Sequence, residues 1–452
     1  MERCCQATTR FFLAGLLLTF LFGGCSVHEN RYTAGLHHRS FIAYWPPPKS
    51  SQQLDLAIKD NIDVKGVVTT DGSEYVAKAG APASQDAECL AIARRRNVLI
   101  VGKTNLSELS ATPSGLNEYF GTPHNPYDKV VGIIPGGSSS GSGAAVASGI
   151  ADVAFGTDTA GSIRLPAAYC GIVGLKTTFG LISLKGVFPV EPHHLDTVGP
   201  MGKDVAHVVL GMDLLQTGFA ARYAKAVAAK PSAKQIKSGR LYLSGTDPQI
   251  DKSIDDALTK AGFQVVLLDQ TFKSEWDQAN RDGNTVAAAG VWISKQQYLS
   301  KWGVRARTKA AILLGRLVYP DRYRRALERR PEWEHALRHV FQTVDFIALP
   351  TVQARPPAIP WFGKRALLEA RVLNMQNTVA VNFAGNPALA VPVPLRHEAF
   401  PVTSLQLVGP KFSESELLNA GRLVEAGIEK SKSVGLTKRI SHLPPNHSQF
   451  HQ

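Results

Sequence analysis

The chain has 452 residues, a formal net charge of +13 at pH 7 and a hydrophobic fraction of 44%. The length allows one large domain or two to three ordinary ones, and the hydrophobic fraction is normal for a globular protein with a sizeable core. The basic excess favours anionic partners without naming one. Only the N-terminus approaches the length of a transmembrane span, which excludes a protein with several membrane-spanning helices.

Residues 1–25 have the pattern of an export signal. Arg3 and Arg10 precede the apolar run FFLAGLLLTFLFGG, which ends at Cys25. A basic region, a short apolar region and small residues before a cleavage site are typical of exported proteins. The segment LFGGC also resembles a bacterial lipobox, although Phe22 stands where an aliphatic residue is usual. We therefore expect a periplasmic or cell-envelope lipoprotein that contacts the membrane through lipidated Cys25; an ordinary cleaved signal and an uncleaved signal anchor are the alternatives.

The rest of the chain divides into three parts by composition. Residues 26–53 include WPPPKSSQQ and predict a polar, proline-rich tether. Residues 54–427 contain the apolar runs and glycine-rich turns of a folded domain. Residues 428–452 are polar and predict a disordered tail.

Strands and helices alternate within the predicted domain. A helix is expected at DAECLAIARRR, beginning at Asp86, because apolar residues recur there at helical spacing. Over 239–269, the segments GRLYLSG, DKSIDDALTKAG and FQVVLLD repeat strand, helix and strand. Further buried strands are predicted at NVLIVGKT, IADVAFGT, DFIALPT and NPALAVPVP. This alternation predicts an α/β fold.

The cysteines and histidines do not form a disulfide framework or a metal-binding pattern. Cys89 and Cys170, outside the signal segment, have apolar neighbours, which favours buried free thiols. A single bridge between them is the alternative in an oxidising compartment. His193 and His194 are adjacent and lack a further ligand motif, so we expect loop histidines and no metal site.

The run PGGSSSGSGAAVASG at 135–149 contains no charged residue. A flexible linker is disfavoured because the composition continues directly into helix and strand segments. A phosphate-binding loop needs a lysine, and none occurs from residue 130 to 175. The segment GSSSG matches the Gly-x-Ser-x-Gly nucleophile elbow, but no clear strand precedes it, so this match alone is weak.

A second serine-containing loop follows at 156–171, GTDTAGSIRLPAAYCG. Its small residues let the backbone approach a ligand and present N–H groups, as in an oxyanion hole, with Ser162 as the nucleophile. No histidine occurs between residues 125 and 192, so a lysine is the alternative base. Lys59 follows the apolar run LDLAI, where burial would keep its amine neutral near the working pH.

In their order along the chain, these motifs resemble those of the amidase signature family. The resemblance covers about residues 54–427 and is weaker from 213 to 345. It implies an α/β fold in which a mixed, mostly parallel central sheet is surrounded by helices. The matching segments are AIKDNIDVKGVVTT, VGKTNLSELS, FGTPHNP, PGGSSSGSGAAVASG, GTDTAGSIRLPAAYCGIVGLKTT, LDTVGPMGKDV and NFAGNPALAVPVP.

The resemblance implies a Ser-Ser-Lys triad. Lys59 corresponds to the catalytic lysine, Ser138 to a bridging serine on a cis peptide bond, and Ser162 to the serine that is acylated. Neutral Lys59 would take a proton from Ser138, which would take one from Ser162 as that serine attacks the carbonyl.

The residues around the triad also receive roles from the resemblance. The expected oxyanion hole consists of the N–H groups of Thr159, Ala160, Gly161 and Ser162. Ser139 is expected to support the lysine and the bridging serine by hydrogen bonds, and Asp158 to pair with Arg164 and hold the loop. Ala160 replaces the commoner glycine, as it does in members that resemble allophanate hydrolases.

The implied function is hydrolysis of a small-molecule carboxylic amide to an acid plus ammonia or an amine, with no metal, organic cofactor or nucleic acid required. One alternative is an amidotransferase subunit that passes ammonia to charged tRNA, which the export signal disfavours. Another is an allophanate- or urea-type amidohydrolase, suggested by Ala160. A third is an inactive membrane-tethered binding protein, which the presence of all three triad residues disfavours. The sequence names neither the amide nor the oligomeric state.

The segment 301–340 is strongly basic, with eleven Lys and Arg against four Asp and Glu. The favoured interpretation is a solvated helix face, and the alternative is a surface that attracts an anionic substrate to the entrance of the site. Arg322, Arg325 and Arg329 would share one helix face, because their spacings are three and four residues.

Cys25→Ala is expected to release the protein from the membrane fraction or to block its processing, because the thiol is the predicted acylation site. Mass spectrometry of the mature N-terminus measures the result directly. A lipidated Cys25 as first residue is expected, and an unmodified terminus beginning after Cys25 would leave only simple export.

Overall fold

The computed structural model describes residues 36–48, 51–128, 132–360, 365–397 and 399–441. The chain divides into a short unit, Met1–Tyr32, and a main unit, Thr33–Gln452, to which all of the described residues belong. The predicted export signal and Cys25 therefore lie outside the described residues. Within these ranges, no helix combines the length and the apolar composition needed to cross a membrane.

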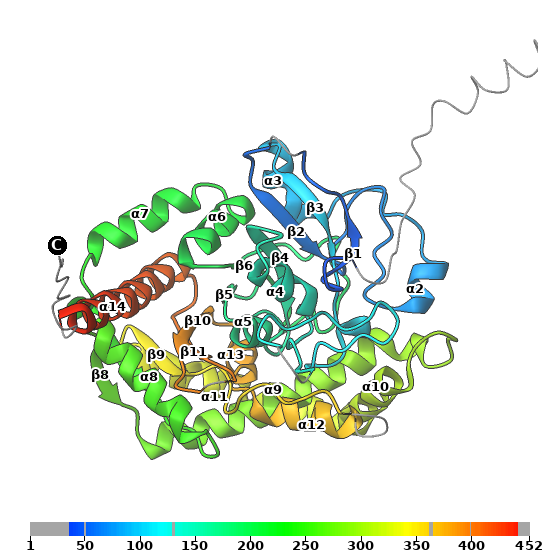
Figure 1. Cartoon of the computed structure of the whole chain (residues 1–452). Helices are drawn as coiled ribbons and strands as arrows, with labels where there is room; N and C mark the ends of the chain where they lie inside the picture. The colour runs from blue at the N-terminus through cyan, green and yellow to red at the C-terminus, as the bar shows by residue number, and fades with distance from the viewer. Residues whose placement is uncertain (1–35, 49–50, 129–131, 361–364, 398, 442–452) are drawn as a thin grey trace, which may run out of the picture. The chain divides into compact units, whose positions relative to one another are not determined.

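The described chain forms one mixed sheet of eleven strands in the order β1-β3-β2-β4-β6-β5-β10-β11-β9-β7-β8 (Figure 1). The strands are β1 (Phe41–Tyr44), β2 (Asp55–Lys59), β3 (Leu99–Thr104), β4 (Val153–Asp158), β5 (Val173–Lys176), β6 (Thr197–Gly202), β7 (Lys237–Arg240), β8 (Gln264–Leu267), β9 (Phe346–Pro350), β10 (Ala388–Pro394) and β11 (Val402–Val408). The predicted α/β class and the mixed sheet are confirmed.

Contrary to expectation, the sheet is not mostly parallel. Parallel pairs occur toward its two ends, where β2 joins β3 and β4, and where β7 joins β8 and β9. The remaining neighbours are antiparallel. The sequence shows strand–helix–strand repeats at those ends, whereas β10 and β11 are joined by residues 395–401, too few for a parallel crossover.

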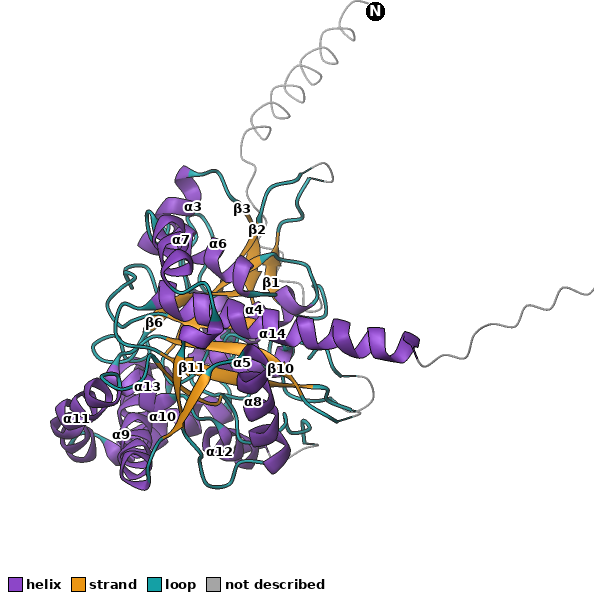
Figure 2. Cartoon of the chain, turned by 90° about the vertical axis from the view of Figure 1, so that its left-hand side faces the viewer, coloured by secondary structure: helices purple, strands orange, loops and turns teal. Residues whose placement is uncertain are grey.

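Helices lie on both sides of the strands (Figure 2). They are α2 (Glu74–Ala79), α3 (Ala91–Arg95), α4 (Ser140–Ala147), α5 (Arg164–Cys170), α6 (Val205–Leu215), α7 (Phe219–Ala229), α8 (Pro248–Ala261), α9 (Gln270–Lys295), α10 (Ala306–Val318), α11 (Asp321–Val340), α12 (Arg365–Met375), α13 (Val379–Ala384) and α14 (Glu414–Ser441). Short 3₁₀ turns occur at Glu88–Leu90, Glu108–Ser110, Ala233–Gln235 and Gln296–Tyr298.

Local sequence signals explain the ends of the predicted helix α8. The side chain of Asp247 accepts a hydrogen bond from the Gln249 N–H, and Pro248 occupies the first turn. Both features favour a helix start. Gly262 follows the last residue with φ of 83°, the left-handed conformation in which helices commonly end.

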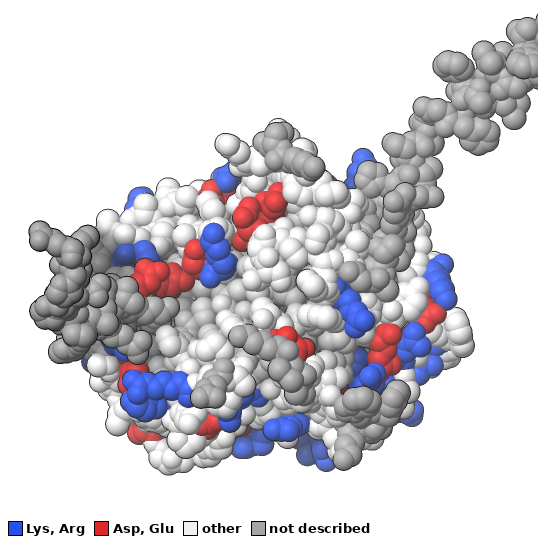
Figure 3. Space-filling model, viewed as in Figure 1, with Lys and Arg blue, Asp and Glu red and all other residues white. Residues whose placement is uncertain are grey.

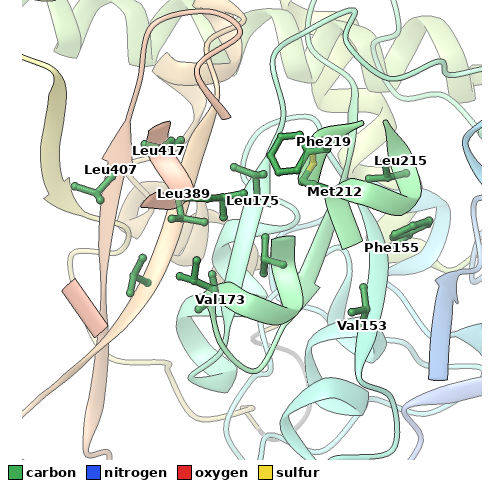
Figure 4. Packing of buried hydrophobic residues seen from close by; sticks show 14 of the residues in the cluster. Val153, Phe155, Val173, Leu175, Met212, Leu215, Phe219, Leu389, Leu407 and Leu417 are labelled. Atoms are coloured by element: carbon green, nitrogen blue, oxygen red, sulfur yellow. The ribbon is translucent and has the colours of Figure 1, made fainter. Parts of the chain in front are cut away.

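The two faces of the sheet pack differently. Large side chains such as Leu56, Phe155 and Leu389 belong to one buried cluster, to which α6, α8 and α14 also contribute. Figure 4 shows Phe155 and Leu389 in this cluster with Met212 of α6 and Leu417 of α14. Alternate residues such as Ala57 point to the other face and pack against α4 and α5. Because side chains alternate along a strand, the small residues on this second face let α4 lie close to the sheet.

The Gly/Ser run therefore forms a tightly packed helix rather than a linker. A Cβ atom on Gly141 would lie only 2.3 Å from the Ser40 carbonyl oxygen and 2.4 Å from the Asn105 nitrogen. Only glycine permits this approach. The run thereby fixes the position of the segment that begins α4.

β1 lies in the segment predicted to be a tether. It pairs antiparallel with β3, with Phe41 opposite Thr104, and the Ser40 carbonyl accepts a hydrogen bond from the Asn105 N–H at 2.9 Å. Phe41 is only 1% exposed. The tether prediction is wrong here, because a four-residue strand is too short to produce a recognisable periodic pattern.

The C-terminal helix also extends beyond its predicted limit. α14 continues through residues 428–441, which were expected to be disordered, and residues 442–452 lie outside the described residues. Its earlier turns bury Leu417, Val424 and Ile428 against the large-residue face of the sheet. Tertiary packing of these turns anchors a helix whose last turns are polar.

The two cysteines are buried free thiols, as predicted. Cys89 packs on the large-residue face of the sheet and Cys170 on the opposite face. Burial raises the pKa of each thiol to about 12. The sheet therefore separates the two side chains, which explains the absence of a bridge.

Phe41→Ala is expected to lower the free energy of unfolding by about 3–5 kcal/mol, because it leaves a cavity beside the sheet edge. The exposed Pro46 provides a matched control in the same segment, and Pro46→Ala should change stability by less than about 0.5 kcal/mol. Chemical denaturation of both variants checks the result. Equal stability of Phe41→Ala and the parent protein would contradict the packing of β1.

Candidate active site

Lys59 ends β2 and is fully buried. Its Nζ donates hydrogen bonds to Ser138 Oγ and Thr157 Oγ1, both at 2.7 Å. Burial, the largest effect, lowers the pKa of Lys59 to about 7, while the negative charges of Asp71 and Asp158 oppose this shift. A substantial fraction of the amine is therefore neutral near pH 7, as a proton acceptor must be.

Ser138 lies immediately before α4, and the peptide bond between Gly137 and Ser138 is cis, as the resemblance implied. The Ser138 carbonyl accepts hydrogen bonds from Ser107 N–H at 3.1 Å and from Ser140 N–H at 2.9 Å. The side chain is buried and faces Lys59. The backbone on both sides of Ser138 thus fixes its hydroxyl against the lysine.

Ser162 lies in the loop between β4 and α5, where its side chain lines a cavity. The Ser139 N–H donates to the Ser162 carbonyl at 3.2 Å, which joins this loop to the start of α4. Among the described residues, the Ser162 hydroxyl has no hydrogen-bond partner, so the direct Ser138–Ser162 bond that the resemblance implied is not formed there. Such contacts often tighten only when substrate is bound.

The expected oxyanion hole is only partly available. The Gly161 N–H donates to Asp158 Oδ1 at 2.8 Å, so in this geometry it is engaged within the loop. The N–H groups of Thr159, Ala160 and Ser162 donate to no acceptor within the described ranges. Gly161 has φ of 135°, and a Cβ there would lie 2.3 Å from Thr378 Oγ1, so glycine is required for close packing of the loop.

Asp158 and Arg164 form the predicted ion pair. Arg164 Nη2 lies 3.0 Å from Asp158 Oδ1, and both side chains are 0% exposed. Burial alone would raise the pKa of Asp158, but the charge and hydrogen bonds of Arg164, with a hydrogen bond from Asn382, hold this pKa far below its ordinary value. Arg164 Nη1 also donates to the Thr378 carbonyl at 3.0 Å and to Gln406 Oε1 at 2.7 Å.

Asp196 also anchors the loop that contains Ser162, and sequence analysis assigned it no role. Its Oδ1 accepts a hydrogen bond from Thr159 Oγ1 at 2.6 Å, and its Oδ2 accepts from the backbone N–H groups of Val190 and Glu191. The carboxylate therefore ties the start of the loop 159–163, called the nucleophile loop after the expected role of Ser162, to the segment before β6. Its motif, LDTVGPMGKDV, was matched, but spacing alone does not give this partner.

Thr157 is the second residue that sequence analysis missed. Its Oγ1 accepts from Lys59 Nζ and, at 3.0 Å, from Asn61 Nδ2. Ser139 Oγ instead donates to the Thr157 carbonyl at 3.3 Å, so Ser139 supports the lysine only indirectly. The available signal was the position of Thr157 in the strand immediately before the nucleophile loop.

A cavity of about 240 Å³ opens beside Ser162. Its walls come from the segment around Thr112, from the nucleophile loop, and from α9, α10 and α12, which lie together in Figure 1. Most of the wall is apolar, with Ala287, Val291 and Leu373 as examples. The segment that matched the family weakly thus supplies much of the substrate-facing surface.

The basic segment divides into two helices with different positions. In α10, Ala311 and Leu314 line the cavity, whereas no described residue of α11 does. In α11, Arg329 pairs with Asp282 and Arg330 with Glu334. The face of the molecule shown in Figure 3 likewise carries basic and acidic side chains together. The arginines of α11 therefore fit the favoured interpretation of a solvated helix face.

Comparison with known proteins identifies a family and similar chains. The Amidase family model matches residues 54–418. The chain is 32% identical to a subunit of the glutamyl-tRNA(Gln) amidotransferase of Natronomonas pharaonis, over 85% of this chain and 99% of the relative.

Solved structures give the same result. An inhibitor-bound structure from work on the origins of an s-triazine catabolic enzyme has a TM-score of 0.71 and 25% identity, covering 83% of this chain and 84% of its own. Native peptide amidase from Stenotrophomonas maltophilia has a TM-score of 0.62 and 25% identity, covering 83% and 82%.

The fold and the buried lysine–serine site are those of an α/β hydrolytic enzyme that acts on amides. The chain belongs to the amidase signature family.

The pH dependence of activity tests the role of Lys59. Because the pKa of Lys59 is lowered to about 7, kcat/KM is expected to rise as the pH increases through about 7 and neutral amine accumulates. Lys59→Met should reduce the rate by about 10²–10⁴-fold and remove this limb. Steady-state kinetics from pH 5 to 9 measure both effects.

Lys176 provides a matched control. It is also buried, and burial also lowers its pKa to about 7. Within the described part of the chain, its Nζ donates to the Thr177 and Asn386 carbonyls and to no serine. Lys176→Met should retain the rising limb in the folded protein. Persistence of the limb at undiminished rate in Lys59→Met would show that Lys59 is not the base.

Proposed function

We propose that the protein hydrolyses a small carboxylic amide to an acid plus ammonia or an amine, through an acyl-enzyme on Ser162. The main support is the 2.7 Å hydrogen bond from buried Lys59 to Ser138, beside the loop that presents Ser162 to a cavity. No histidine lies in the contacts described for this centre, and the lysine supplies the base.

In the first half of the reaction, neutral Lys59 accepts a proton from Ser138, which accepts the proton of Ser162. The Ser162 oxygen attacks the amide carbonyl, and the N–H groups of Ala160 and Ser162 stabilise the oxyanion. The proton returns from Lys59 through Ser138 to the leaving nitrogen. The C–N bond then breaks, which releases ammonia or an amine and leaves an ester on Ser162.

In the second half, water replaces the amine. Lys59 and Ser138 remove a proton from water as it attacks the ester carbonyl. The tetrahedral intermediate collapses, the acid leaves, and the proton passes back to Ser162. The enzyme is thereby restored with no net change in its protons.

A second candidate function is participation in an amidotransferase complex, since the relative from Natronomonas pharaonis carries that name. In this case the ammonia released at Ser162 would pass to charged tRNA, and the protein would act together with partner subunits. Purified protein that hydrolyses amides alone at full rate would favour the independent hydrolase. The export pattern of residues 1–25 also favours an independent hydrolase over an amidotransferase subunit. The protein would then lie in the cell envelope with a membrane anchor at Cys25.

Labelling with a fluorophosphonate tests the proposal. Ser162→Ala is expected to abolish labelling and to reduce turnover by about 10⁴-fold or more, because the nucleophile is removed. Ser139→Ala is the neighbouring control and should retain measurable activity. Peptide mapping that finds the label on Ser138 or Ser139 in Ser162→Ala would overturn the assigned roles.

A further inference from the structure

Two carboxamide side chains in the cavity wall have no hydrogen-bond partner among the described residues. Gln376, between α12 and α13, is only 4% exposed. Asn284 projects from α9, and its Oδ1 atom is buried and unpaired. Buried polar groups in folded proteins are normally paired. Both side chains thus have unused donors and acceptors inside the substrate cavity.

Gln376 lies directly beside the nucleophile loop. A Cβ built on Gly161 would be 3.1 Å from Gln376 Oε1, which places the carboxamide against the residue before Ser162. The backbone of Gln376 forms a β-bridge with Val352. Thr378, two residues later, donates a hydrogen bond to the Ala160 carbonyl. These contacts hold the backbone of Gln376 beside the loop that carries Ser162, and its carboxamide oxygen lies next to Gly161.

The cavity wall offers no free charge within the described residues. Its charged member, Glu369, pairs with Arg307 and accepts hydrogen bonds from the N–H and hydroxyl groups of Ser114. The other polar members are neutral, and apolar residues such as Leu314 and Leu373 form the outer wall. An ammonium or carboxylate group on a substrate would enter without a counter-charge, which is unfavourable.

Building on the proposed function, we propose that Gln376 and Asn284 bind a second, uncharged hydrogen-bonding group of the substrate. The substrate class is a small neutral amide that carries a carboxamide, carbonyl or hydroxyl group in addition to the scissile amide. A side-chain carboxamide has two donors and an accepting oxygen, and can satisfy each of these groups. Plain alkyl amides and zwitterionic amino-acid amides would each leave part of the site unsatisfied.

Four substrates of similar size separate these cases. Succinamide carries a second neutral carboxamide, and 4-methylpentanamide replaces that group with an isopropyl group of the same shape. Succinamate carries a negative charge at this position, and glutamine carries both charges. The measurement is kcat/KM from ammonia release, with the value for succinamide halved because its two amides are equivalent.

The full-length protein is expected to prefer succinamide to 4-methylpentanamide by about tenfold or more. Succinamate and glutamine should be slower than succinamide by about a hundredfold or more. In Gln376→Leu, kcat/KM for succinamide should fall about tenfold while that for 4-methylpentanamide stays unchanged or rises. Asn284→Leu, at a half-buried helix position, should also lower the ratio of kcat/KM for succinamide to kcat/KM for 4-methylpentanamide.

Leu373→Ala is the matched control, because it alters the same cavity without removing a hydrogen-bonding group. It should change both neutral substrates equally. Protection of Ser162 from the fluorophosphonate by succinamide and by 4-methylpentanamide gives a second measurement of the preference, which does not depend on turnover.

This inference alone would be overturned if Ser162 is labelled but kcat/KM for succinamide is about equal to that for 4-methylpentanamide. It would also be overturned if Gln376→Leu and Asn284→Leu leave the ratio of these two values unchanged. Efficient hydrolysis of glutamine would do the same. Absence of both labelling and ammonia release from every amide would overturn the proposed function and the inference with it.

Discussion

The active site depends on the ion pair between Asp158 and Arg164, whose side chains are both fully buried. Breaking such a pair by removing one partner typically costs about 3–5 kcal/mol, since the other charge is left buried. Arg164 links the pair to the carbonyl of Thr378 and to Gln406, while Asp158 holds the backbone of the nucleophile loop. The shape of the loop is therefore set by electrostatics, and the Gly161 N–H is committed to that role.

Lys59 differs from other buried lysines nearby in its partners. Lys103 and Lys295 form buried ion pairs with Asp60 and Asp71, whereas the hydrogen-bond acceptors of Lys59 among the described residues are hydroxyl groups. Burial without a direct carboxylate partner favours the neutral amine. The pKa of Lys176 is lowered to the same value of about 7. A lowered pKa therefore does not distinguish Lys59 by itself, and the hydrogen bond from Lys59 to Ser138 is the additional feature.

Sequence reasoning located the strong motifs because each combines unusual composition with fixed order, and the α/β class followed from alternating strands and helices. It could not predict the antiparallel middle of the sheet, because strand direction depends on connections that composition does not reveal. Thr157 and Asp196 were missed since their partners lie far away in the sequence. Gln376 could not be identified for a related reason. The sequence does not show whether an uncharged side chain has a hydrogen-bond partner in the folded protein.

The cavity joins two parts of the chain with different requirements. The reacting groups lie on segments near β2, α4 and β4, whose close packing tolerates little change, as the space around Gly141 shows. Much of the opposite wall comes from α9, α10 and α12, where side chains such as Leu314 are largely exposed. Substitutions in α9, α10 and α12 can therefore change the shape of the cavity without disturbing the packing around Lys59, Ser138 and Ser162. The volume and polarity of the cavity are therefore set largely by helices that carry none of the lysine and serine residues of the site.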